Sequence, residues 1–111
     1  MALPKSNRVK EEKDINLLFR KGRAIKGRFL LIKFLETQKD RDRAVVIVSN
    51  KVQRKANIRN AIRRVLSDEV SKDLKRINNK DIAILVTVFP KETTWKKILR
   101  EEACQLLKEI K

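Results

Sequence analysis

The densest group of chemically distinctive side chains lies in the segment 51–66, KVQRKANIRNAIRRVL, which holds six Lys or Arg residues and no acid. Residues four apart stack on one face of a helix, so Arg59 and Arg63 would form one basic column and Asn60 and Arg64 a second beside it. Guanidinium forks in this arrangement suit phosphate groups. The segment therefore predicts a phosphate-binding helix, and the plainer alternative is a solvated basic face.

The residues that precede this helix strengthen the prediction. Lys51, Arg54 and Lys55 stand in a polar connection, and Asn57 is the predicted N-cap of the helix. Cations at a helix N-terminus are opposed by the helix dipole, at a cost of roughly 0.3–1 kcal/mol each. A bound phosphate would reverse that cost, because it satisfies the free N–H groups and the guanidinium groups together.

The composition excludes several kinds of catalytic chemistry. The chain has no His and a single Cys, Cys104, so Ser–His and Cys–His pairs, zinc-type ligand clusters and an internal disulfide framework are all ruled out. Acid–base chemistry by carboxylates is the alternative that the composition leaves open. The sequence accordingly predicts no catalytic set and no metal site on the protein.

The net charge of +15 is distributed unevenly along the chain. Residues 41–64 hold 8 basic and 1 acidic side chains, whereas residues 65–111 hold 10 and 8. A charge that served only solubility would be spread more evenly. One-sided positive charge of this size indicates a polyanionic partner, most often a nucleic acid.

The length of 111 residues suits one domain, 1–111, with one core. Residues 1–10 carry basic side chains, among them Arg8, and are expected to form a flexible arm. Neither a signal peptide nor an apolar run of the roughly 20 residues that cross a membrane is visible. We therefore expect a cytoplasmic protein with no membrane partner.

Hydrophobic periodicity predicts the order helix, two or three strands, helix, strand and helix, over residues 11–21, 24–26, 28–36, 44–48, 58–76, 82–88 and 95–109. Turns are predicted at 37–42 and 77–81, and Thr93 or Thr94 is predicted to cap the last helix. The continuously apolar run AVVIV at 44–48 is typical of a strand buried on both faces. This order predicts an α/β (α+β) two-layer sandwich with a small mixed sheet and one βαβ unit.

Several segments in register resemble the protein subunit of bacterial ribonuclease P. The family pattern has a "VS-K" strand end and then a helix with Arg-Asn, an aliphatic residue and two basic residues, matched here by Val48, Ser49, Lys51, Arg59, Asn60, Ile62, Arg63 and Arg64. NRVK at 7–10, DINLLFRKG at 14–22 with Phe19 and Gly22, DIAILV at 81–86 and the last helix also match. Ala61 departs from the pattern, since the family has a second Arg there.

The resemblance implies a fold, αβββαβα, whose βαβ crossover is left-handed, against the general rule. It implies a protein that binds a large catalytic RNA and holds the 5′ leader of precursor tRNA in a cleft between the first helix and the sheet. The RNA, with Mg²⁺ bound mainly by the RNA, would perform the hydrolysis; DNA is not an expected partner. The implied RNA-binding residues are Arg59, Asn60, Arg63, Arg64, Lys51, Arg54, Lys55 and Arg8, and the implied cleft residues are Phe19, Ile15 and Lys33.

Each of these assignments has an alternative. Phe19 and Ile15 could be core residues of the first helix, Lys33 could protect a sheet edge, and Arg8 could belong to a solubilising arm. As a whole, the chain could be a structural ribosomal RNA-binding protein with a similar βαβ unit. The register of Phe19, Gly22 and the basic helix favours the ribonuclease P subunit, and a helix-turn-helix DNA binder fits poorly because strands flank the basic helix.

Overall fold

The computed structural model describes residues 12–36, 43–73 and 80–110. Within them the chain forms three helices and four strands, in the predicted order: α1 (Glu12–Lys21), β1 (Arg23–Lys26), β2 (Leu30–Glu36), β3 (Arg43–Val48), α2 (Ala56–Asp73), β4 (Lys80–Val86) and α3 (Trp95–Lys108). The turn expected at 37–42, the end of the central helix at 76, most of the second turn and the arm at 1–10 lie outside the described residues.

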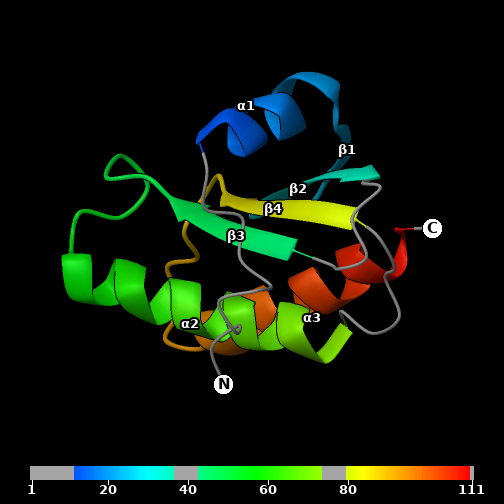
Figure 1. The fold of residues 1–111 in the computed structure, drawn as a ribbon. Coiled ribbons are helices and arrows are strands. Elements are labelled where there is room, and N and C mark those ends of the chain that lie inside the picture. The colour runs from blue at the N-terminus through cyan, green and yellow to red at the C-terminus, as the bar shows by residue number, and fades with distance from the viewer. Residues whose placement is uncertain (1–11, 37–42, 74–79, 111) are drawn as a thin grey trace.

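The four strands form one mixed sheet in the order β1-β2-β4-β3, in which β3 is parallel to β4 and the other pairs are antiparallel. Helix α1 lies on one face of this sheet, and α2 and α3 lie on the other (Figure 1). The chain leaves β3, returns along α2 beneath the sheet and enters β4 by a left-handed crossover (Figure 1). The predicted mixed α+β sandwich is thus confirmed.

The main core lies between the sheet and the pair α2–α3. Alternate residues of the strands point into it, among them Ile32 from β2 and Ile84 from β4, as the period of two along a strand requires. Ile62 and Leu66 of α2 and Leu107 of α3 close the core from the helical side, and all five side chains are fully buried. This packing holds α2 with its opposite flank facing outward.

The run at 44–48 does form a strand, but the prediction that it is buried on both faces is wrong. Strand β3 lies at the edge of the described sheet, and Val45, Val46 and Ile47 are only half-buried. The strand buried on both faces is β4, which lies between β2 and β3. A continuous apolar run indicates a strand, but whether that strand lies at the edge or in the interior of the sheet depends on which strands pair with it.

The predicted N-cap at Asn57 is also wrong. Helix α2 begins at Ala56, and the carbonyl of Lys55 already accepts the N–H of Arg59 at 3.0 Å, so Asn57 lies within the first turn and is exposed. The loop before the helix is ordered by its own polar groups: Ser49 accepts the N–H of Val52, and the Gln53 side chain accepts the N–H of Lys55 at 3.1 Å. These bonds end the loop two residues before the expected cap. Thr94 does occupy the N-cap of α3, without a side-chain capping bond.

Helix α1 is docked on the other face of the sheet by close contact at its C-terminal end. Leu18 is its one fully buried residue, and Gly22 donates its N–H to the Leu18 carbonyl at 2.8 Å. A Cβ at Gly22 would lie 2.3 Å from that carbonyl oxygen and 3.1 Å from the carbonyl oxygen of Phe34. Glycine is therefore required at this position, chiefly by the last turn of α1 itself and in addition by the approach of the chain to β2.

Replacing Gly22 with Ala should lower the free energy of unfolding by about 1–3 kcal/mol, the usual cost of forcing extra volume into a packed site. Both obstructing atoms belong to the backbone, so neither can move away as a side chain would. Urea unfolding followed by circular dichroism measures the change. An unchanged unfolding midpoint would contradict the close approach.

Candidate nucleic-acid interface

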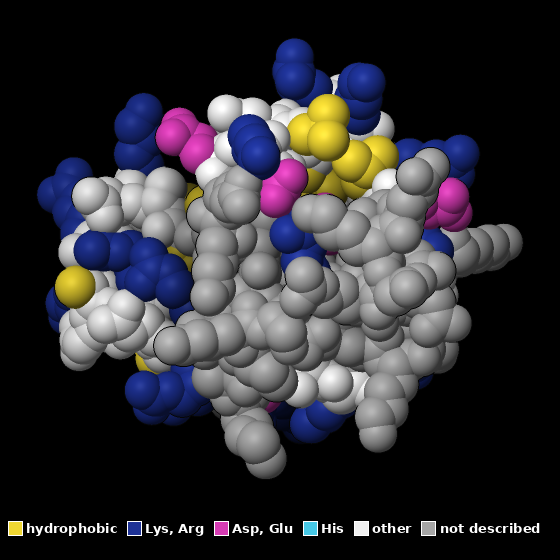
Figure 2. All heavy atoms as spheres, viewed as in Figure 1, with side chains coloured by type: hydrophobic (Ala, Val, Ile, Leu, Met, Phe, Trp, Pro, Cys, Tyr) yellow, Lys and Arg dark blue, Asp and Glu magenta, His cyan; other side chains and the backbone are white. Residues whose placement is uncertain are grey.

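The loop between β3 and α2 and the first turns of α2 form an open, basic hollow at one end of the molecule. Its volume is about 550 Å³, and Asn50, Lys51, Arg54 and Arg59 line it. Lys and Arg side chains gather over this end, at the left of Figure 2. Lys51, Arg54 and Lys55 are all exposed, as the sequence predicted for a polar connection.

Arg59 has a structural role that the sequence did not reveal. Its Nη1 donates to the backbone carbonyls of Gln53 at 3.0 Å and Arg54 at 2.8 Å, and the residue is half-buried. Arg59 thus fastens the basic loop to the helix. A guanidinium has five N–H donors, so the Nε and Nη2 hydrogens are not used by these two bonds.

The remaining predicted residues of α2 are also brought together. Arg63 donates from Nη1 to the side-chain oxygen of Asn60 at 2.8 Å, which joins the two predicted columns, and Arg64 is exposed. The first turn of α2 contains no acid. Within the described ranges, the ion pairs found involve none of the Lys or Arg side chains of segment 51–66. Among the residues that the structure describes, no ion pair therefore offsets the positive charge of this surface.

The three predicted cleft residues lie on the other side of the sheet, Ile15 and Phe19 on α1 and Lys33 on β2 beneath it. Lys33 donates from Nζ to the Phe19 carbonyl at 2.8 Å, and its Nζ lies 5.5 Å from the centre of the Phe19 ring. Lys33 therefore satisfies a free carbonyl of the last turn of α1. Because β2 is an interior strand, the alternative that Lys33 protects an edge is wrong. Ile15 and Phe19 are half-buried, and Arg8 lies outside the described residues.

A cluster that the sequence analysis missed joins α1 to the parallel strands. Arg43 donates from Nε and Nη2 to the two oxygens of Asp81, at 3.0 and 2.8 Å, and from Nη1 to Asp14 at 3.3 Å. The side chains of Arg43, Asp14 and Asp81 are 11%, 18% and 9% exposed. The hydrogen bond with Asp81 is the main cause that raises the pKa of Arg43, against the opposing effect of burial.

The sequence did contain a signal for this cluster. Arg43 precedes the apolar run of β3 and Asp81 precedes that of β4, and the two residues are register partners in the parallel pair. Aligning the two runs as parallel strands would have placed the opposite charges side by side.

A second missed contact joins α3 to the turn between β1 and β2. The Glu102 carboxylate accepts the backbone N–H groups of Arg28, Phe29 and Leu30, at 2.9, 2.8 and 2.6 Å. Three consecutive N–H groups directed at one carboxylate form a strong, charge-assisted set. The Glu102 carboxylate therefore has a structural role, since it fixes α3 to this turn.

The described surface offers donors to an anion and no set of ligands for a metal. Among residues 12–36, 43–73 and 80–110, there is no group of three or more Asp, Glu, Cys or His side chains that could hold a metal ion. No described helix is long and apolar enough to cross a membrane. What the basic hollow can do chemically is neutralise and hydrogen-bond phosphate groups.

Comparison with known proteins gives a consistent result. The family model described as Ribonuclease P matches residues 3–111. Two curated relatives are named ribonuclease P protein component. The protein from Synechococcus sp. (strain WH7803) is 26% identical, and the match covers 98% of this chain and 96% of the relative. The protein from Syntrophomonas wolfei is 33% identical, and the match covers 76% of this chain and 70% of the relative.

Solved structures share the fold. The RNase P protein from Thermotoga maritima aligns with a TM-score of 0.76 at 22% identity, over 94% of this chain and 97% of that chain. The RNase P protein from Staphylococcus aureus aligns with a TM-score of 0.73 at 21% identity, over 96% and 93%. Both likenesses extend over nearly the whole sandwich.

Replacing Arg59 with Ala should release the loop at 51–55. We expect hydrogen exchange of the loop amides to accelerate at least about tenfold, because hydrogen bonds from a charged donor contribute roughly 1.5–3 kcal/mol. Arg63→Ala is the matched control, since it removes the same charge from the same helix and bonds only to a side chain. Equal exchange rates in the two variants would contradict the fastening role of Arg59.

Proposed function

The chain belongs to the ribonuclease P protein family, and from this premise we propose that it is the RNA-binding subunit of a ribonucleoprotein that removes the 5′ leader from precursor tRNA. The observation that carries the proposal is the basic surface at the start of α2, which has no ion pair among the described residues, in a chain that matches the family over residues 3–111. A structural ribosomal RNA-binding role is not favoured, because the relatives and the structural neighbours are ribonuclease P proteins.

The basic surface would bind the catalytic RNA through its phosphates. Arg63 and Asn60, joined by their hydrogen bond, would present a fixed pair of side chains to the ribose–phosphate backbone. Arg59 would hold the loop in place with Nη1 and offer its other N–H groups outward. Lys51, Arg54, Lys55 and Arg64 are exposed and would add further phosphate contacts, and Arg8 would add one from the N-terminal arm.

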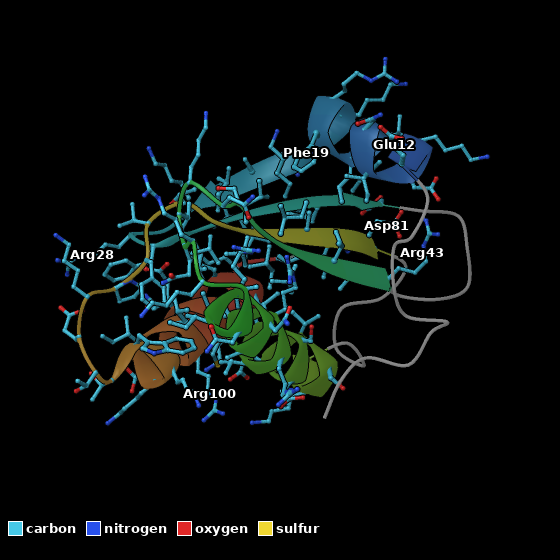
Figure 3. All side chains as sticks on the ribbon, turned by 90° about the vertical axis from the view of Figure 1, so that its left-hand side faces the viewer. Glu12, Phe19, Arg28, Arg43, Asp81 and Arg100 are labelled. Atoms are coloured by element: carbon cyan, nitrogen blue, oxygen red, sulfur yellow. The ribbon has the colours of Figure 1, made fainter. Side chains whose placement is uncertain are left out.

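The region between α1 and the sheet would receive the single-stranded leader. Phe19 is half-buried and offers part of a ring on which a base could stack, and Ile15 adds apolar contact on the same helix. Figure 3 shows Phe19 on α1, close to the sheet. Lys33 would act chiefly by holding Phe19 in place, because its ammonium group is engaged by the Phe19 carbonyl.

The hydrolysis itself would belong to the RNA. The chain has no His, and the described side chains do not fit a magnesium site on the protein. Mg²⁺ would therefore be bound mainly by the RNA. The protein would contribute positive charge, which reduces the repulsion between two polyanions, the catalytic RNA and its substrate.

Adding the purified chain to a bacterial ribonuclease P RNA at low Mg²⁺ concentration should restore cleavage of precursor tRNA. A variant with Arg63→Ala and Arg64→Ala should need at least about tenfold more protein for the same rate, because two charged phosphate contacts are lost. Gel analysis of the cleaved leader measures both. Failure of the wild-type chain to stimulate the RNA, while it folds normally, would contradict the proposed function.

Replacing Phe19 with Ala should weaken binding of precursor tRNA by about 5- to 150-fold, which corresponds to the roughly 1–3 kcal/mol of one base–aromatic stack. Binding of mature tRNA, which lacks the leader, should be unchanged. Phe19→Leu is the control for packing, since leucine keeps the apolar volume and removes the flat ring. If leucine restores full precursor binding, or if both tRNAs lose affinity equally, Phe19 acts through packing and the stacking role is wrong.

A further inference from the structure

Helix α1 is held on the sheet by few apolar contacts and by a polar bond near each end. Of its ten residues only Leu18 is fully buried. Near the C-terminal end, Lys33 of β2 donates to the Phe19 carbonyl at 2.8 Å. In its first turn, Asp14 accepts a hydrogen bond from Arg43 of β3 at 3.3 Å. Among the described residues, these two bonds join the ends of α1 to the sheet, and both contribute to the placement of the helix.

The contact in the first turn is built on a fixed base. Asp81 binds Arg43 through two bonds, at 3.0 and 2.8 Å, and both residues belong to paired strands. The guanidinium is therefore oriented by the sheet, and its remaining nitrogen, Nη1, faces Asp14. Figure 3 shows Arg43 and Asp81 together at the end of the sheet that lies beneath the start of α1.

Arg43 also bridges the side of α1 that the sheet supports least. The helix packs against β2 and β4, whereas β3, the strand that carries Arg43, is the edge strand beyond them. Asp14 lies one residue before Ile15 and five before Phe19 on the same short helix. A shift at Asp14 would consequently move both side chains relative to the sheet.

We propose that Arg43 is a positioning residue, which, with Asp81 orienting it, holds Asp14 and thereby sets the position of α1 over the part of the sheet that we assign to the leader. This inference rests on the proposed function, because it assigns Arg43 a part in leader binding. A simpler interpretation makes the opposite prediction: if Asp14 only repelled phosphates, removing its charge would raise the affinity for RNA.

Asp14→Ala separates the two interpretations, with Glu12→Ala as the matched control. Both variants remove one acid from the first turn of α1, but Glu12 is exposed and has no ion pair among the described residues. Asp14→Ala leaves Arg43 paired with Asp81, so no guanidinium is left without a partner. Arg43→Lys is a further variant, since it keeps the charge and loses the fork.

The first measurement is hydrogen exchange of the α1 amides in the full chain, relative to those of α3. Asp14→Ala and Arg43→Lys should accelerate exchange in α1 about fivefold, equivalent to about 1 kcal/mol, and Glu12→Ala should leave it unchanged. The second is the ratio of mature to precursor Kd in the assembled ribonucleoprotein. Asp14→Ala should lower this preference for precursor about fivefold and leave mature tRNA binding unaltered.

Unchanged α1 exchange, or a rise in precursor affinity in Asp14→Ala, would overturn the positioning role of Arg43. A different result tests the proposed function itself: if the wild-type ribonucleoprotein shows no preference for precursor, the assignment of the leader to the region between α1 and the sheet is wrong. In that case the exchange rates still decide whether Arg43 holds α1 on the sheet.

Discussion

The mutual repulsion of the cations at the N-terminal end of α2 is the constraint on which the account of this molecule depends. Like charges four residues apart on a helix cost a few tenths of a kcal/mol, and each cation near the helix N-terminus adds roughly 0.3–1 kcal/mol. Burial of apolar side chains in the core between the sheet and α2–α3 offsets these costs, and Ile62 and Leu66 of α2 are fully buried there. A helix anchored on one flank can keep an unfavourable charge on the other.

The described charges divide into two groups by what they contact. Arg43 and Glu102 are satisfied within the fold: Arg43 binds two carboxylates, and Glu102 binds three backbone N–H groups. Among the described contacts, Arg59 and Arg63 of α2 bond to carbonyl or amide oxygens, which orient the guanidinium groups and leave their charge intact. The first group determines how α1 and α3 sit on the sheet, and the second faces outward. This division is what an RNA-binding surface on a stable scaffold requires.

Much of this fold could be predicted from the sequence, because periodicity reports which residues face a core. The order of elements, the βαβ unit and the outward arginines of α2 were predicted in this way. Features that depend on partners distant in the sequence were not. The edge place of β3 depends on strand pairing, and the start of α2 at Ala56 depends on Gln53 and Ser49, which order the preceding loop. The bonds that Arg59 and Lys33 make to backbone carbonyls were not predicted either, because side-chain type does not show which carbonyl a donor will reach.

The salt dependence of binding to ribonuclease P RNA tests most directly whether the cations at the start of α2 contact phosphates. For 6–10 phosphate contacts, affinity should fall by about 10³–10⁵ between 50 and 200 mM salt, and replacing Arg59, Arg63 and Arg64 together with Ala should reduce the log–log slope by about 2–3. A nearly flat slope for the wild-type chain, or a slope that the triple variant leaves unchanged, would contradict the account.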